Sequence, residues 1–508
     1  MKNVVIVGVG ECVEAVPDNL ESASSPLDLI EKATITALAD TGAKNIKDAI
    51  GTVAVVRTFS DTTPLQKSPF GDPENFPRSV SKRLSIDPEY AVYSTAGGQA
   101  PQQLVNEFST AISRGDRDVV LLVGAEALAN QKALRRANVK ADWGDTAQGQ
   151  IDDRPVNISD IIDAEQIKNQ LVHIPAIYSL FETARRGRLG LGRKEYTRAC
   201  GELFAPFSDM ASKHVCAMFP QSYDAPSIGQ VTDKNTAVTD CYTRAMVAKD
   251  GVNQGTAIVM MSEDKAKALG IDRSKWVYPV SGSSATELPI YKREDLGGSV
   301  AMKASYDAAF QSAGLDISDV THMDIYSCFP IAVFSACEAL GIETNDPRGL
   351  TVTGGLPFFG GAGNNYSSHG IINIVKALRD TPNGVGLVGA NGGFLSKHSA
   401  GLYAKSAPVN GWQEADKAAL AKTVTAQASP DIAIHAEGTA RIETFSVEFN
   451  RKGAKRGYVI GRLPDDHRFY AYADDADTIQ TLLERDPLRR KIIVTRKGPG
   501  NRFSFGLD

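Results

Sequence analysis

The chain has 508 residues, of which 42% are hydrophobic and 23% charged, and its formal net charge is −5 at pH 7. That length suits about three domains of ~150 residues, and the composition is ordinary for a globular protein with sizeable cores. Acidic and basic residues are interspersed, which argues against a protein that binds nucleic acid over its whole surface.

The cysteines and the first residues point to the cytoplasm. The six cysteines are scattered and form no CxxC pair, so we expect reduced thiols and no zinc ribbon. The opening residues MKNVVIVGVG lead straight into an expected strand and lack the pattern of a secretory signal. No apolar run approaches the ~20 residues that a membrane-spanning helix needs. We therefore expect a cytoplasmic protein with no membrane association.

The N-terminal segment alternates strands and helices. Val4–Val7 predicts a buried strand that ends in a tight turn at Gly8-Val9-Gly10. Apolar residues at helical spacing predict a helix over Leu27–Ala39, and Ile50–Val56 predicts the next strand. This alternation is typical of an α/β fold.

Two segments far apart share one plan. A turn of small residues, Ser94–Gln99, precedes a helical pattern and then a strand, Val119–Val123, that ends in the triplet VGA. The same order recurs with the turn Gly360–Asn365 and the strand Val385–Val388, which also ends in VGA. One offset superposes both the turns and the triplets, so the sequence predicts an internal duplication.

The remaining segments complete the predicted domains. The polar stretch from about 130 to 245 is expected to be an inserted loop domain, and Ser262 is expected to cap the helix after the strand Ala257–Met261. Beyond Pro430, about five short strands, with a hairpin at Pro464–Asp466, predict a small antiparallel barrel. We expect domains at 1–275, which includes the loop domain, at 276–408 and at 430–508.

Several motifs together resemble the thiolase superfamily over about residues 1–405. They are GDRDVVLLVGAEALA, GTAIVMMSEDKAKALGI, YSCFP, GGLPFFGGAGNNYSSH and GANGGFLSKH. With the C-terminal β-module, they resemble the type 1 thiolase-like proteins, many of which carry the name acetyl-CoA acetyltransferase. The resemblance implies a duplicated thiolase fold of five αβαβα layers, an OB-like barrel, CoA or acyl-CoA as ligand and a homodimer.

The same resemblance shows that the usual catalytic residues are replaced. It puts Gly98 at the nucleophilic cysteine, Ala390 at the second cysteine and Gly361 at the activating histidine. Tyr326 takes the place of the asparagine or histidine of the second motif. Glycine cannot be acylated, so condensation through an acyl-cysteine is not expected.

A different set of polar and small residues is expected at the site. Tyr326, with an ordinary pKa near 10, is a proton donor first, and histidine is the natural proton carrier near neutral pH. The candidates for catalysis are Tyr326, His369 and His398. The candidates for substrate binding are Gly97, Gly98, Gly360, Gly361, Asn364, Asn391 and Gly392. Each has a structural alternative: close packing for the glycines, turn support for the asparagines, and a core position for the tyrosine and histidines.

Cys328 lies in the second motif, where the resemblance implies a small, non-catalytic residue. No His, Cys and Asp cluster has the spacing of metal ligands, so no metal is expected.

Two functions follow. The first is an acyltransferase or C–C bond-cleaving enzyme that acts on a CoA thioester without the cysteine nucleophile, and needs no cofactor besides that thioester. The second is a non-catalytic protein that binds CoA or acyl-CoA. Basic and aromatic residues of the barrel would suit single-stranded nucleic acid, but acidic residues dilute the positive charge. A solvated face or a lid over the site is therefore expected, and nucleic acid is not.

Overall fold

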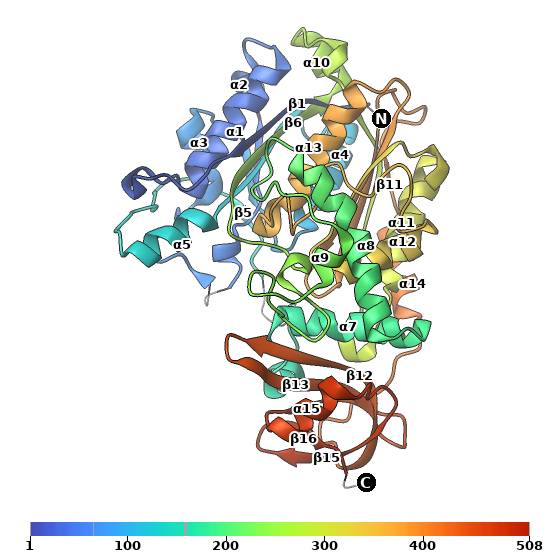
Figure 1. Cartoon of the computed structure of the whole chain (residues 1–508). Coiled ribbons are helices and arrows are strands. Elements are labelled where there is room, and N and C mark those ends of the chain that lie inside the picture. Colours follow the sequence, from blue (N-terminus) through green and yellow to red (C-terminus); the bar gives the residue numbers. More distant parts are fainter. Residues whose placement is uncertain (1, 64–65, 157–158, 160, 507–508) are drawn as a thin grey trace.

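The computed structural model describes residues 2–63, 66–156, 159 and 161–506 (Figure 1). Two mixed sheets form the body of the protein. The first sheet has the order β1 (Val4–Val13), β6 (Asn253–Ser262), β4 (Val119–Ala127), β2 (Thr52–Val55), β3 (Tyr90–Tyr93) and β5 (Asp152–Asp153). The second has the order β11 (Gln413–Glu414), β7 (Tyr278–Thr286), β10 (Lys397–Ala404), β9 (Val385–Gly392) and β8 (His322–Ile325).

The two sheets repeat one topology. The order β1-β6-β4-β2 in the first corresponds to β7-β10-β9-β8 in the second. In both, the first two pairings are antiparallel and the third is parallel. The internal duplication predicted from the glycine turns is therefore present in the strand order.

Helices form three layers around these sheets. Along β2, Val53 and Val55 join the outer core, whereas Ala54 joins the core between the sheets, because successive strand residues face opposite sides. Outside the first sheet lie α1 (Pro26–Thr41), α2 (Ile46–Ala49), α3 (Phe76–Leu84) and α10 (Glu263–Ala268). Between the sheets lie α4 (Ala100–Arg114) and α13 (Tyr366–Arg379). Outside the second sheet lie α11 (Val300–Ala313), α12 (Pro330–Leu340) and α14 (Lys417–Thr425). The predicted five-layer α/β fold is thus confirmed.

The predicted helix cap at Ser262 is confirmed, but the first predicted glycine turn is not. Ser262 caps α10 by accepting a hydrogen bond from the Lys265 N–H, as expected. The predicted turn at Gly8–Gly10 is wrong, since β1 continues to Val13. A β-carbon on Gly8 or Gly10 would collide with carbonyl oxygens of α1, so these glycines allow helix and strand to pack closely.

Most of the loop domain covers the outer side of the second sheet, whereas Leu134 of its first helix joins the outer core of the first sheet. Its helices are α5 (Leu128–Ala137), α6 (Ala164–Lys168), α7 (Ile174–Leu189), α8 (Arg193–Ser212) and α9 (Ala225–Gly229). Phe181 of α7 and Phe204 of α8 share one core cluster with Ile331 of α12.

No helix in the described ranges is both long and apolar enough to cross a membrane.

The C-terminal module is a closed five-stranded barrel. Its strands follow the order β12 (Gly438–Asn450), β13 (Gly453–Arg462), β14 (Arg468–Ala473), β16 (Gly500–Ser504) and β15 (Lys491–Lys497). The helix α15 (Ala476–Glu484) lies between the third and fourth strands in sequence. A closed Greek-key barrel of five strands is the architecture of an OB fold. In Figure 1 the barrel lies directly below α7, and β12 packs against that helix.

The barrel docks on the body through one face of β13 and β14. Tyr458, Ile460, Tyr470 and Tyr472 belong to the core cluster of the loop domain, not to the barrel's own interior. OB folds bind oligonucleotides with the face of their second and third strands. In this protein the corresponding face is covered by its own loop domain.

A buried ion pair links the N-terminal strand to the central helix α13. The Glu11 carboxylate, 1% exposed, receives His369 Nδ1 at 2.7 Å and Lys376 Nζ at 2.6 Å. Burial alone would raise the pKa of Glu11, but hydrogen bonds and charge from His369 and Lys376 lower it to about 2. The ionised Glu11 therefore contributes its full stabilisation of the fold above about pH 4.5. This contribution is lost as the pH falls from about 4.5 toward 2.

Replacing this carboxylate should destabilise the fold in a pH-dependent way. At pH 7, Glu11→Gln should lower the free energy of unfolding by roughly 3 kcal/mol, because the ion pair is buried. The difference from wild type should narrow at about pH 3. Urea unfolding at both pH values measures it, with Asp307→Asn in the exposed Lys303–Asp307 pair as a control that changes stability by less than about 0.5 kcal/mol. An equal difference at both pH values would contradict the assignment.

Candidate functional site

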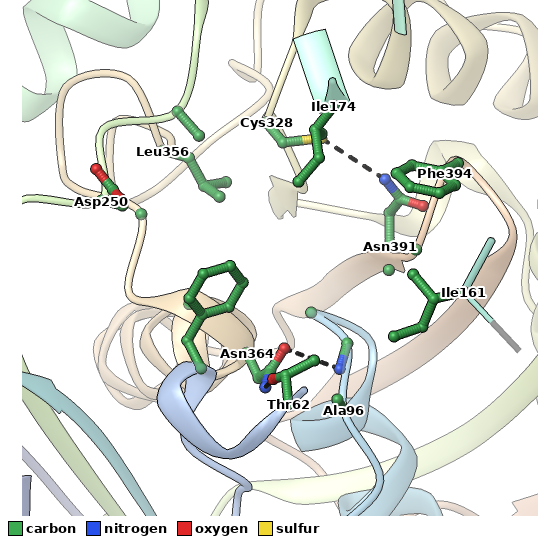
Figure 2. A pocket seen from close by; sticks show the side chains of 18 of the residues that line it. Thr62, Ala96, Ile161, Ile174, Asp250, Cys328, Leu356, Asn364, Asn391 and Phe394 are labelled. Atoms are coloured by element: carbon green, nitrogen blue, oxygen red, sulfur yellow. Dashed lines mark hydrogen bonds between the residues drawn. The ribbon is translucent and has the colours of Figure 1, made fainter. Parts of the chain in front are cut away.

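A cavity of about 470 Å³ lies at the N-terminus of α4. It is bounded by the turn before α13, by the turn between β9 and β10, and by the first turn of α7. Figure 2 shows Ile161, Ile174, Leu356 and Phe394 around its open space. The lining is mainly apolar with a few polar groups, as in pockets for small ligands.

Most of the residues predicted for the site line this cavity. From the predicted set, the lining includes Gly97, Gly98, Gly361, Asn364, Asn391, Gly392 and Tyr326. Gly360, His369 and His398 are not among the described residues that line the cavity. The duplicated turns and the strand end of β9 thus meet at one place, while the two histidines lie elsewhere.

The space above Gly98 is filled by Tyr326. A β-carbon on Gly98 would lie 2.5 Å from Tyr326 Cε2 and 2.5 Å from the Asn391 carbonyl oxygen, and it would also collide with the Tyr326 hydroxyl. The tyrosine hydroxyl therefore lies where the side chain of residue 98 would begin. Because interiors are close-packed, a cysteine at 98 and a tyrosine at 326 cannot both fit in this geometry.

Tyr326 is a neutral proton donor at the base of the cavity. Its side chain packs edge-on against Tyr366, with ring centroids 5.4 Å apart, and the residue is 9% exposed. Among the described residues its hydroxyl has no hydrogen-bond partner. Burial, together with the nearby Cys328, raises the pKa of Tyr326 well above its ordinary value. A hydroxyl in this state can donate to a ligand oxygen, but it is not a thermodynamically favourable base near neutral pH.

Asn391 supplies an acceptor beside that donor. Its amide nitrogen donates to the Tyr178 hydroxyl at 3.4 Å and to Cys328 Sγ at 3.7 Å, the second of which is drawn in Figure 2. Its Oδ1 atom is buried and has no partner among the described residues. The unpaired oxygen costs free energy unless a ligand or water donates to it.

Cys328 also lines the cavity, but it is not set up as a nucleophile. The residue is 8% exposed, and burial raises the pKa of its thiol to about 12. The thiolate is the reactive form of cysteine, so this thiol stays inert near neutral pH.

Asn364 holds the backbone of the first turn. Its Oδ1 accepts the Gly97 N–H at 2.9 Å, and its Nδ2 donates to the Arg57 carbonyl at 2.9 Å and to Thr62 Oγ1 at 3.0 Å. Figure 2 shows the contact with Gly97. Because these bonds use the amide on both sides, Asn364 positions the Gly97–Gly98 turn.

The two histidines are bound to other parts of the fold. His369 is fully buried beside Glu11 of β1 and does not line the described cavity. His398 contacts Ser299 Oγ at 3.1 Å through Nε2, and burial lowers its pKa to about 4 despite the nearby Glu287 carboxylate. Gly360, with φ of +127°, serves a tight turn, where a β-carbon would lie 2.8 Å from Val252.

Two residues that sequence reasoning missed shape the cavity. Tyr178 of α7 stacks on Phe329 at 4.2 Å and donates its hydroxyl to the Gly393 carbonyl at 2.9 Å. It lies in the inserted loop domain, and no local pattern marks it. Glu126 accepts the Phe59 N–H at 2.6 Å, and burial raises its pKa well above the ordinary value. A carboxyl directly after the VGA triplet of a buried strand was a usable signal.

A metal centre has no support in the described ranges, where no three His, Cys, Asp or Glu side chains are grouped to hold an ion.

Comparison with known proteins identifies related chains. A family model described as "Thiolase-like protein type 1 additional C-terminal domain" matches residues 419–499. The solved structure of a monomeric SCP2-thiolase like protein type 1 from Mycobacterium smegmatis superposes with a TM-score of 0.85, at 38% identity over 99% of each chain. No curated protein matches the chain.

Two more distant structures share the fold. An Ltp2-ChsH2(DUF35) aldolase superposes with a TM-score of 0.57 at 16% identity, over 79% of this chain and 97% of that one. An acetyl-CoA acetyltransferase from Syntrophomonas wolfei gives 0.56 at 14% identity, over 80% and 100%. At these identities the likeness concerns the fold alone.

The contact between Gly98 and Tyr326 predicts coupled effects on stability. Gly98→Ala should cost roughly 1–3 kcal/mol through overpacking. In a Tyr326→Ala background the cost should be smaller, because two of the three close contacts are gone and only the Asn391 carbonyl remains. Gly361→Ala, whose β-carbon would lie 3.2 Å from its nearest neighbour, is the matched control and should cost less than about 1 kcal/mol. Urea unfolding of the four proteins of the cycle measures the coupling, and additive effects would refute it.

Proposed function

The chain belongs to the SCP2-thiolase-like type 1 family, and we propose that it binds a coenzyme A thioester with the acyl carbonyl next to the Tyr326 hydroxyl. The observation that carries this proposal is the position of the Tyr326 hydroxyl, which lies over the N-terminus of α4 and has no partner among the described residues. Glycine at 98 leaves room for the Tyr326 side chain, so that the tyrosine hydroxyl reaches the base of the cavity. The helix start favours a partial negative charge on the thioester oxygen, and the hydroxyl adds a hydrogen bond to it.

The apolar part of the cavity suits the acyl group. Its apolar lining includes Phe59, Leu128, Ile161, Ile174, Val247, Leu356 and Phe394. Burying an acyl chain among such side chains gains roughly 0.8 kcal/mol per CH₂ group. No cofactor besides the thioester is required by this arrangement.

The chemistry that fits is carbon–carbon bond cleavage without an acyl-enzyme. Gly98 and Ala390 offer no nucleophile, and the Cys328 thiol is protonated. In a 3-hydroxyacyl thioester, the hydroxyl proton passes to water and the Cα–Cβ bond breaks, releasing a carbonyl compound. The bonding electrons form an enolate whose negative oxygen is the former thioester oxygen. Tyr326 stabilises that oxygen, and protonation at Cα gives the shortened thioester.

A second candidate is a binding protein without turnover. Of the residues described as lining the cavity, none is a histidine, and the carboxylate among them, Asp250, is ion-paired with Lys132 at 2.6 Å. Proton transfer near neutral pH is usually carried by a group with a pKa in that range. The absence of such a group from the described lining favours binding alone.

Quaternary state and location complete the proposal. The Mycobacterium smegmatis relative is described as monomeric, so the expected homodimer has no support, and we propose a monomer for this chain. The outer edge of β3 is covered by the chain's own β5, and the charged pair Asp152 and Asp153 discourages pairing with a second sheet. All six cysteines are free, which supports a location in the reducing cytoplasm.

A monomer predicts one species of 54.4 kDa in light scattering coupled to gel filtration. That mass should hold as the protein concentration rises. A mass twice as large would show that the β3 edge, or another face, pairs between copies.

Loss of the Tyr326 hydroxyl should weaken either proposed function. If the protein turns over 3-hydroxyacyl-CoA or 3-oxoacyl-CoA, Tyr326→Phe should lower kcat/KM by about 10²–10³-fold, as for loss of one oxyanion donor. If it only binds, the same change should weaken thioester affinity by about tenfold. A turnover screen combined with titration calorimetry separates the two functions.

The matched control is Tyr403→Phe. That hydroxyl is also fully buried, and it donates to Gln102 Oε1 at 2.7 Å, away from the described cavity lining. It should leave affinity and turnover unchanged. If Tyr326→Phe turns the substrate over as fast as wild type, the proposed enzymatic function is wrong. If the wild-type protein binds no thioester, both proposed functions are wrong.

A further inference from the structure

The turn between β9 and β10 forms one wall of the cavity. Phe394 of this turn lines the cavity, and Asn391 and Gly392 precede it at the end of β9. The turn contains Leu395, which has φ of +49°, a conformation that L-residues rarely adopt. Tyr178 bridges the turn by donating to the Gly393 carbonyl and accepting the Leu395 N–H at 3.2 Å. The position of the cavity wall thus depends on contacts from other segments.

Arg293 provides a second contact to this turn. The residue is 2% exposed, and its Nη2 donates to the Phe394 carbonyl at 2.9 Å. Its Nε donates to the Leu288 carbonyl at 3.0 Å, and the guanidinium packs over the Phe181 ring of α7 at 5.1 Å. A planar guanidinium fixes several partners at once, so Arg293 ties the turn to its own segment and to α7.

Arg468 of the barrel holds that segment in turn. It is fully buried and pairs with both carboxylate oxygens of Glu443, at 2.9 and 2.6 Å. Its Nη1 donates to the carbonyls of Tyr291, at 2.9 Å, and Arg293, at 2.6 Å. A continuous line of buried polar contacts therefore runs from the barrel through residues 291–293 to Phe394.

We propose that Arg468 and Arg293 are positioning residues, through which the C-terminal barrel sets the cavity wall at Phe394 and Asn391. The barrel itself contributes no described residue to the cavity lining, so it acts from a distance and not as a lid. Its effect on ligand affinity rests on the proposed thioester function, whereas its effect on the turn does not.

Another barrel contact of similar burial offers a control. Arg186 at the end of α7 is 3% exposed and pairs with Asp486 at 2.6 and 3.0 Å. It joins the barrel to the body as Arg468 does, but its contacts are with Asp486 and the Leu191 carbonyl and do not include the β9–β10 turn. A merely stabilising role for the barrel would make the two arginines equivalent.

The test compares Arg468→Met with Arg186→Met in the full-length protein. Hydrogen exchange of the peptide that covers residues 391–396 should be about tenfold faster in Arg468→Met, and should match wild type in Arg186→Met. Affinity for acetoacetyl-CoA should fall about tenfold in the first variant and stay unchanged in the second. If Arg468→Met does not fold, Glu443→Gln is the milder variant, and should show a smaller change in the same direction.

The proposal would be overturned if the exchange rate of this peptide equalled that of wild type in both variants, or if it rose by the same factor in both. If wild-type protein does not bind the thioester, the proposed function fails. The exchange comparison needs no ligand and still decides whether the barrel positions the turn.

Discussion

The space above Gly98 is the constraint on which the site depends. The Tyr326 ring and the Asn391 carbonyl fill the volume that any side chain at 98 would need. These groups lie at the ends of strands β8 and β9 of the second sheet, whereas Gly98 lies in the turn before helix α4 of the first half, so the contact joins the two duplicated halves. Close packing allows a cysteine on the helix or a tyrosine over it, but not both. The residues at 98 and 326 therefore depend on each other: a larger side chain at 98 requires a smaller one at 326.

This dependence limits the chemistry that the site can support. A cysteine at a helix start becomes a thiolate, whereas a buried phenol stays protonated and donates a hydrogen bond. The helix start and the Tyr326 hydroxyl favour a ligand that develops negative charge on one oxygen. The unpaired Asn391 oxygen favours a hydrogen-bond donor on the same ligand. The barrel, which lies outside the cavity, is joined to it by Arg468 and Arg293. Buried hydrogen bonds therefore connect the cavity wall to the barrel.

Local patterns predicted the fold well, and long-range contacts explain what they missed. The duplication, the helix cap at Ser262 and the barrel strands were visible because turns, caps and alternation are local signals. Gly8 and Gly10 were misread as a turn, because their contacts with α1 are tertiary. The His369 partner, Glu11, lies 358 residues away in the sequence, so the burial of that histidine had no local sign. Tyr178 reaches the cavity through packing of the loop domain, and Arg293 contacts the cavity wall at Phe394 through tertiary packing.

The most direct test of the central claim is the ¹³C NMR shift of the thioester carbonyl in acetoacetyl-CoA labelled at C1, when bound to the protein. A hydrogen bond from Tyr326 polarises that carbonyl, so its resonance should move downfield on binding to wild type and return toward the free value with Tyr326→Phe. The same shift in both proteins would show that Tyr326 does not touch the thioester oxygen. A resonance of a covalent acyl-enzyme would contradict the account altogether.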